Sequence, residues 1–309
     1  MPNNNKNSTL AGYAFLASLL FIPSSIQAAG FDIWIYSLDY DDTSQQWSLG
    51  EAKAVTERDG YDNQPSFSPD SQNLLFTSDR IDAQNDIYQY RLTDGTLSQL
   101  TFTPKQSEYS PQAFTNGTDS YQLKYVVEQG VPHQSVWQQT SNSPRKRAIN
   151  SYIPTGYFAS DERLGTLIWA RYAYSLYFEP KGETADERHF VVENVGRSIH
   201  AIPNDQAFSY LHKQLDGDRV IKRFSPQDNS HSLLITLASS ASEDYAWSQN
   251  NWLLNIDSGY LRGWNSASKQ QADWQILSPI PAPSEHYLNA SRIAVSPDSK
   301  HLAVVWQRK

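Results

Sequence analysis

One short phrase occurs near both ends of the chain. Residues 66–78 read SFSPDSQNLLFTS and residues 293–306 read IAVSPDSKHLAVVW, so each copy places Ser-Pro-Asp-Ser before an apolar run. In this phrase Pro fixes φ for a turn and the Asp side chain accepts backbone N–H groups, which favours a structural role. Two widely separated copies predict an internal repeat, and a repeat limits the possible folds more than any single motif.

The first copy begins a unit of three short strands. Asn73–Thr77, Asp86–Leu92 and Leu97–Thr101 are rich in strand-forming residues, and Asp94 and Gly95 lie between the last two. An Asp-Gly pair between two strands is typical of a tight hairpin, because both turn residues must tolerate positive φ. The unit is therefore predicted to be antiparallel.

Weaker copies of the unit follow along the chain. Each has a leading segment, a polar turn and an apolar strand, and they start at Glu108, Gly156, Arg197, Glu243 and Ser291. With the first unit this makes six, at roughly 45 residues each, as expected for four-stranded propeller blades. The third copy is the most irregular, so the bounds of that blade, around residues 152–179, are the least defined.

The last unit lacks its outer strands. They are found at the other end of the chain, because Phe31–Leu38 (FDIWIYSL) matches Asn85–Leu92 (NDIYQYRL) position for position. We expect the last blade to take its inner strands from the C-terminal segment and its outer strands from the N-terminal segment. Such pairing closes the ring and removes two exposed sheet edges.

Composition agrees with this prediction. Aromatic residues are 13% of the chain, Met occurs once and Cys is absent, and the aromatic residues favour strands. We predict an all-β protein, a six-bladed β-propeller closed by its two terminal segments, with residues 29–309 as its one domain.

Several segments resemble a known family. Residues 60–80 (GYDNQPSFSPDSQNLLFTSDR) and 85–101 (NDIYQYRLTDGTLSQLT) resemble the repeat of TolB-like β-propellers, a WD-like or PD-type family of bacterial exported proteins. Segments 107–111, 195–203 and 242–247 resemble an exported six-bladed subgroup of that family. The resemblance implies the fold but not the function, because such propellers host binding proteins, scaffolds and peptidase gates. TolB also carries an α/β domain for which this chain has no room, so its partners are not transferred.

The first 28 residues have the pattern of a secretory signal peptide. Lys6 lies in a polar start, Leu10–Ile22 is an apolar run that is short for a membrane span, and Pro23 follows it. Cleavage is expected after Ala28 or Ala29, and an uncleaved anchor is the alternative. We therefore expect a periplasmic protein with no membrane span after cleavage.

The charge of the chain limits its partners. The formal charge of −8 argues against a nucleic-acid binder, because the phosphate backbone requires a basic face. The compact basic run Pro144–Arg147 is interpreted as a solvated loop.

The leading segments of the repeats are the best candidates for a functional site, since they enter the innermost strand of each blade. They contribute four carboxylates, two guanidiniums and one imidazole: Asp62, Glu108, Arg197, His200, Glu243, Asp244 and Arg292. Converging at the ring axis, these groups would form a concave charged site that binds a ligand or a partner's loop. The alternative is that they are loop residues paired across neighbouring blades.

Metal sites have little support in the sequence. The four carboxylates are ligands that calcium prefers, but none lies in a consecutive calcium loop. The seven His residues are dispersed without an HExxH pair, so zinc is not expected, and no cofactor is predicted. His200 is interpreted as a structural hydrogen-bonding residue.

Catalysis by a nucleophile is not expected either. Neither a Gly-x-Ser-x-Gly elbow nor a Gly-rich phosphate loop occurs in the sequence. We therefore favour a monomeric, non-catalytic module that binds a protein or peptide of the cell envelope. One alternative is a hydrolase or lyase that uses carboxylates such as Glu108 and Glu243 as acid and base. The other is a sensor of a small ligand or cation.

Overall fold

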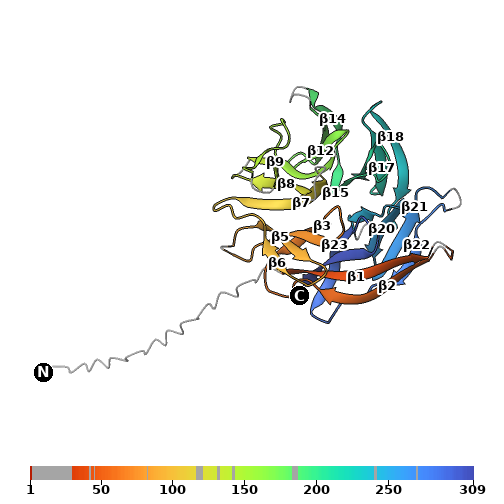
Figure 1. The fold of residues 1–309 in the computed structure, drawn as a ribbon, viewed down its shortest axis with the longest axis horizontal. Coiled ribbons are helices and arrows are strands. Elements are labelled where there is room, and N and C mark those ends of the chain that lie inside the picture. Colours follow the sequence, from red (N-terminus) through yellow and green to blue (C-terminus); the bar gives the residue numbers. More distant parts are fainter. Residues whose placement is uncertain are drawn as a thin grey trace.

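The strands form a ring of six blades around a central axis (Figure 1). The computed structural model describes residues 1, 30–41, 43–44, 46–81, 83–115, 121–130, 133–140, 143–182, 187–239, 242–268 and 271–309. The expected signal peptide lies outside these residues, apart from Met1. Within the described ranges, no helix has the length and apolar character that a membrane crossing needs.

Five blades are continuous in sequence and each is a four-stranded antiparallel sheet. The first has β3 (Asp62–Phe67), β4 (Asn73–Ser78), β5 (Asp86–Arg91) and β6 (Leu97–Gln99). The second has β7 (Ser107–Thr115), β8 (Tyr121–Glu128), β9 (Gln134–Gln139) and β10 (Lys146–Arg147). The third has β11 (Thr155–Asp161), β12 (Gly165–Ala170), β13 (Ser175–Pro180) and β14 (His189–Val192). The fourth has β15 (Val195–Ala201), β16 (Phe208–Lys213), β17 (Arg219–Ser225) and β18 (Ser230–Thr236). The fifth has β19 (Tyr245–Trp247), β20 (Trp252–Asp257), β21 (Tyr260–Asn265) and β22 (Gln275–Pro279).

The sixth blade confirms the predicted closure. Its strand order is β2-β1-β24-β23, where β1 is Phe31–Asp41, β2 is Gln46–Ala54, β23 is Tyr287–Val295 and β24 is His301–Arg308. β1 pairs antiparallel with β24 from Phe31 opposite Gln307 to Ser37 opposite His301. The two terminal segments therefore share one sheet (Figure 1).

Asp32 fixes this closing sheet from inside. Its fully buried carboxylate accepts hydrogen bonds from the Arg58 backbone N–H at 3.0 Å and from the Tyr287 hydroxyl at 3.0 Å. It also accepts one from Nε of Arg308, 276 residues away. A buried carboxylate is tolerated only when such partners replace its hydration, and these bonds join the start of β1 to both β23 and β24.

The two Ser-Pro-Asp phrases form the same turn in two blades. Ser68 Oγ donates to Asp70 Oδ1 at 2.5 Å, and Ser296 Oγ donates to Asp298 Oδ1 at 2.5 Å. The turns also contact one another, because the Asp298 N–H donates to Ser71 Oγ at 3.0 Å. The repeated phrase thus connects the closing blade to the first blade.

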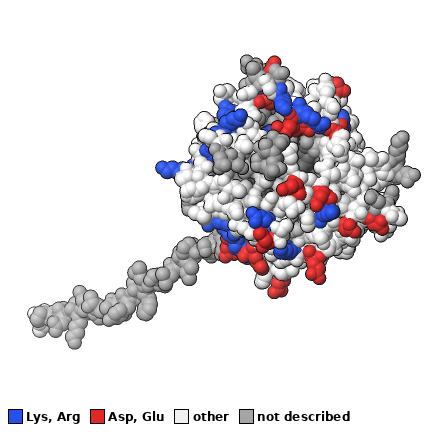
Figure 2. All heavy atoms as spheres, viewed as in Figure 1, with Lys and Arg blue, Asp and Glu red and all other residues white. Residues whose placement is uncertain are grey.

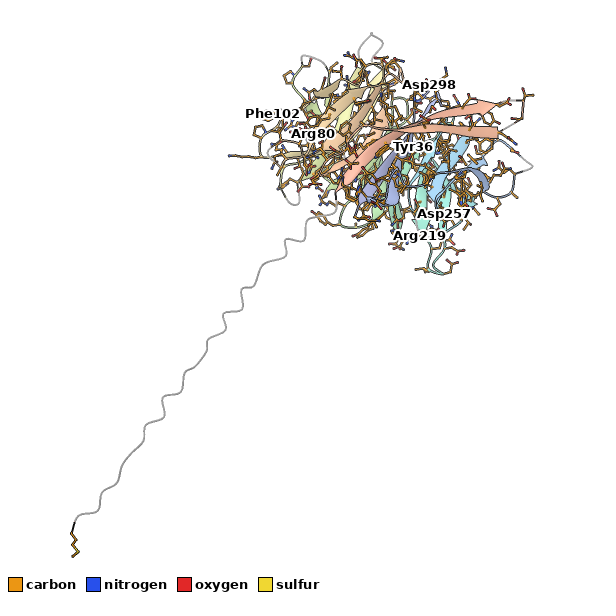
Figure 3. All side chains as sticks on the ribbon, turned by 90° about the horizontal axis from the view of Figure 1, so that it is seen from below. Tyr36, Arg80, Phe102, Arg219, Asp257 and Asp298 are labelled. Carbon is orange, nitrogen blue, oxygen red and sulfur yellow. The ribbon has the colours of Figure 1, made fainter. Side chains whose placement is uncertain are left out.

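The core lies between successive blades. One buried cluster joins Ile33 and Val305 of the closing blade to Phe76 and Tyr88 of the first blade. Each blade buries apolar side chains on both faces, which accounts for the many aromatic residues in the sequence. The turn of Asp298 lies on one face of the ring, and Arg219 and Asp257 lie on the opposite face (Figure 3).

Candidate functional site

A cavity of about 320 Å³ runs along the ring axis, lined by residues of the inner part of all six blades. The inner strands β3, β7, β11, β15 and β23 each carry a register shift, for example between Asn63 and Ser66 and between Tyr109 and Gln112. A bulge changes the direction of the side chains beyond it. The residues that line the cavity mostly follow these bulges.

Three of the expected charged residues meet at this cavity. The Arg197 guanidinium donates to both oxygens of Asp244, from Nε to Oδ1 at 3.2 Å and from Nη2 to Oδ2 at 2.5 Å. Nη1 of Arg292 lies 3.9 Å from Oδ1 of the same carboxylate. Arg197 lies in β15, Asp244 immediately precedes β19 and Arg292 lies in β23, so three blades build one charged cluster.

Tyr157 of β11 completes the cluster. Its hydroxyl accepts a hydrogen bond from Nη2 of Arg292 at 2.9 Å, and the guanidinium lies 5.1 Å from the ring centre. Among the described residues that line the cavity, Asp244 is the only carboxylate and faces two guanidiniums. The cavity therefore carries a surplus of one positive charge.

His200 lines the same cavity without adding charge. Burial lowers the pKa of its imidazole to about 4, against the opposing effect of Asp244. Its Nε2 lies 3.1 Å from the Ser198 hydroxyl, and the ring also bonds to the backbone of Tyr245. Both contacts are to groups of the protein itself.

The other three candidates do not line the cavity. The fully buried side chain of Asp62 lies 3.4 Å from Nη1 of Arg58 and 3.3 Å from Nη2 of Arg80. Asp62 precedes the bulge of β3, and both cations contact its Oδ2. Burial nevertheless raises the pKa of Asp62.

Glu108 and Glu243 have similar surroundings. Glu108 is buried, accepts from Nη1 of Arg145 at 2.7 Å, and has a pKa that burial raises. Glu243 lies 2.8 Å from Nζ of Lys213 and 3.1 Å from Nη1 of Arg219. Every one of the four candidate carboxylates thus faces a cation. In the part of the chain that the structure describes, no three His, Asp or Glu side chains are grouped as metal ligands.

A second cavity, of about 360 Å³, adjoins the first and shares Gln64 and Tyr157 with it. We call it the tyrosine vestibule. It is lined by five tyrosines and a tryptophan, which are Tyr61, Tyr109, Tyr157, Tyr172, Tyr174 and Trp169, together with Gln64, Val126, Gln134, Gly156 and Arg171.

Sequence reasoning missed the tyrosines of the vestibule. A signal was present, because Tyr61, Tyr109 and Tyr157 each lie in the leading segment of one of three successive repeats. Repeated aromatic residues were attributed to packing between blades. These three are only partly buried and line a cavity.

The surface around the site has mixed charge. Figure 2 shows blue and red side chains interspersed over the visible face of the ring, without a broad field of one sign. This face therefore has no broad electrostatic potential of one sign that would attract a highly charged partner. Recognition here must depend on the local groups of the cavities.

Comparison with solved structures finds the same fold in several proteins. A protein assigned as TolB from Agrobacterium tumefaciens has a TM-score of 0.62 at 12% identity, covering 91% of this chain and 99% of that one. TolB from Acinetobacter baumannii has a TM-score of 0.53 at 10% identity, with 89% and 64% covered. A gluconolactonase from Xanthomonas campestris has a TM-score of 0.59 at 10% identity, with 88% and 94% covered.

These likenesses show the fold, which is a six-bladed β-propeller consistent with the TolB-like type. No protein-family model matches the sequence, and no curated protein matches it. Since a gluconolactonase shares the architecture, the fold does not decide between binding and catalysis.

Proposed function

We propose that the protein is a periplasmic, non-catalytic binding module whose axial cavity holds a carboxylate-bearing segment of a protein or peptide of the cell envelope. The observation that carries this proposal is the pairing of two guanidiniums with one carboxylate, which leaves positive charge for a ligand to neutralise. The expected signal peptide supports the periplasmic location.

The chemistry of the cluster suits such a ligand. Arg292 is held by Tyr157 and lies 3.9 Å from Asp244, a longer separation than the bidentate contact of Arg197. It therefore retains N–H donors that can bind a second carboxylate, and guanidinium–carboxylate contacts are charge-assisted and directional.

Peptides of matched length test this proposal. An acetylated, amidated Ser-Ser-Ser-Ser-Glu-Glu peptide and its Gln-Gln counterpart would be titrated into the purified protein by calorimetry. We expect binding of the acidic peptide only, weakening as salt is raised. Arg292→Gln should abolish it, whereas Arg91→Gln, on an exposed strand position, should not. Equal binding of both peptides, or an unaffected Arg292→Gln protein, would sink the proposal.

The enzyme alternative has less support in the geometry. A glycosidase-type mechanism needs two carboxyl groups flanking one bond, but Glu108 and Glu243 lie outside the axial cavity and face cations of their own. A cation sensor is also disfavoured, since the cavity already has a surplus of positive charge.

A further inference from the structure

The tyrosine vestibule has chemistry that binding of a carboxylate does not use. Its two tyrosines on the Arg171–Tyr174 turn are largely accessible, with 53% of Tyr172 and 58% of Tyr174 exposed. Exposed aromatic groups beside a cavity are typical of a binding surface. A carboxylate bound at Arg197 and Arg292 would leave these tyrosines unused.

The walls of the vestibule are held in place by aromatic packing. Trp169 contacts Tyr157 edge-on at 5.3 Å between ring centres and Tyr174 at 5.4 Å. A Cβ on Gly156 would lie 2.6 Å from the Trp169 ring, so only glycine allows this ring to lie against β11. The rings of Trp169, Tyr157 and Tyr174 are thus held by packing, with little side-chain entropy left to lose on binding.

The polar groups of the vestibule include free donors. Tyr157 accepts a hydrogen bond from Arg292, and Tyr109 accepts one from Asn85 at 3.1 Å. Each phenol has a single hydrogen, and these contacts leave it available to a ligand. Tyr61 contributes a third phenol, which is protonated at neutral pH as phenols ordinarily are, and burial raises its pKa further, to about 12.

Acceptors are scarce in comparison. No carboxylate is among the described residues that line the vestibule. Glu128, the partner of the lining residue Arg171, accepts on Oε2 from Nη1 of Arg171 at 2.8 Å and from Nε2 of Gln134 at 2.5 Å. The Oε1 of Gln134 is enclosed by protein. A ligand that needs its own N–H or O–H groups satisfied is therefore at a disadvantage here, whereas a ligand with acceptors and apolar bulk fits.

A proline-rich segment has this combination. Each Pro offers a carbonyl acceptor, lacks an N–H donor, and presents an apolar ring. Such segments adopt the polyproline II helix, which is preformed and docks into grooves lined by aromatic side chains. A saccharide, in contrast, brings a donor with every hydroxyl group.

We propose that the tyrosine vestibule binds a proline-rich segment in the polyproline II conformation, adjacent to the carboxylate that enters the axial cavity. This inference rests on the proposed function and specifies its partner as a peptide that joins prolines to an acidic residue. Tyr157 connects the two parts, because it lines both cavities and holds Arg292.

Four acetylated, amidated peptides separate the two proposals. They are Pro-Pro-Pro-Pro-Glu-Glu, Ser-Ser-Ser-Ser-Glu-Glu, Pro-Pro-Pro-Pro-Gln-Gln and Ser-Ser-Ser-Ser-Gln-Gln, each titrated into the purified protein. We expect the first to bind most tightly, by about tenfold over the second, which corresponds to ~1.4 kcal/mol.

Two variants place the proline contact in the vestibule. Tyr174→Ala removes a wall, and Tyr109→Phe removes one hydroxyl donor, so each should weaken the proline–acid peptide about three- to tenfold. Neither should alter binding of the serine–acid peptide. Tyr260→Ala, at an exposed position on β21 outside both cavities, is the matched control. Thermal unfolding by circular dichroism establishes that each variant is folded.

The outcomes are distinguishable. If the two acidic peptides bind equally and both require Arg292, the proposed function stands and the proline inference is wrong. If both proline peptides bind and depend on Tyr174 but not on Arg292, the vestibule proposal stands alone. If no peptide binds, or if maltohexaose occupies the vestibule in place of the proline peptides, the inference is overturned.

Discussion

Arg197 and Asp244 form a bidentate ion pair across two neighbouring blades, with donor–acceptor distances of 3.2 and 2.5 Å. Asp244 is 6% exposed, and the guanidinium also donates to the Ser291 carbonyl at 3.0 Å, which adds the closing blade. One arginine thus connects three blades at the axis. Because Asp244 also sets the surplus charge of the cavity, the pair has consequences for both stability and binding.

Replacing this carboxylate should separate the two effects. Asp244→Asn leaves Arg197 without its counter-ion, and we expect a loss of about 1–3 kcal/mol in the free energy of unfolding, measured in urea. The range is below that of a fully buried pair because 36% of the Arg197 side chain is exposed. The same change raises the positive charge of the cavity, so the acidic peptide should bind more tightly. Weaker binding by a folded Asp244→Asn protein would contradict this account.

The free energy of unfolding should decrease as the pH is lowered, because of His200. Its pKa is about 4 in the folded protein and 6.5 in the absence of burial, so between these values the unfolded chain binds the proton and the folded protein does not. The stabilisation is complete above pH 6.5 and is lost as the pH falls toward 4, by as much as ~3 kcal/mol.

The comparison of two glutamine variants isolates the contribution of His200 to the pH dependence of stability. His200→Gln should reduce the dependence of the unfolding free energy on pH between 7 and ~4.5, while His133→Gln, at an exposed position, should retain it. Burial also lowers the pKa of His212 and His231, which act in the same sense in all three proteins. Raised pKa values at Asp62 and Glu108 act in the opposite sense and are common to all three proteins. Parallel pH profiles for wild type and His200→Gln would show that burial of this imidazole is not the cause.

The sequence predicted the fold better than the site, for a physical reason. Blade number and closure follow from hydrophobic periodicity and from the match of Phe31–Leu38 with Asn85–Leu92, both of which can be recognised in short segments of the sequence. The direction in which a side chain points at the ring axis depends on the bulges of the inner strands. These bulges shift the register at different points in different blades. Arg197 lies within the bulge of β15 and reaches the cavity, whereas Asp62 precedes the bulge of β3 and does not.

The partners of the buried carboxylates were also beyond prediction from sequence. Glu108 meets Arg145 from the outer part of the second blade, a contact that depends on the path of a loop. Arg145 belongs to the short basic run that was interpreted as a solvated loop. In the structure it also lies over the Trp137 ring at 5.1 Å, so this part of the run is structural.

Ring closure should depend on Asp32. Asp32→Ala removes the acceptor of the Arg308 and Tyr287 hydrogen bonds, and we expect a loss of ~3–5 kcal/mol, the range for breaking a buried ion pair. Asp39→Ala lies in the same strand at an exposed position and should change stability by less than ~0.5 kcal/mol. Chemical unfolding of the two proteins measures the difference. A similar small effect for both would show that Asp32 is not needed for closure.

Gly156 should control the geometry of the vestibule. Gly156→Ala places a methyl group against the Trp169 ring, and overpacking of this kind costs ~1–3 kcal/mol. The smaller ring of a Gly156→Ala/Trp169→Phe protein should recover part of that loss, so the two changes should be non-additive in thermal unfolding. Additive losses would mean that the glycine is not required by the ring.

The closing blade also dictates an order of events during synthesis. β1 and β2 emerge early and pair with each other, yet the second neighbour of β1 is β24, whose residue Arg308 is 276 positions from Asp32. Until that strand is made, a long apolar strand has one unpaired edge, and contacts over such separations form slowly. We expect the nascent chain to depend on chaperones or on export in an unfolded state. A chain that loses β24 would remain an open ring with two unpaired strand edges. Such fragments should be prone to aggregation and degradation.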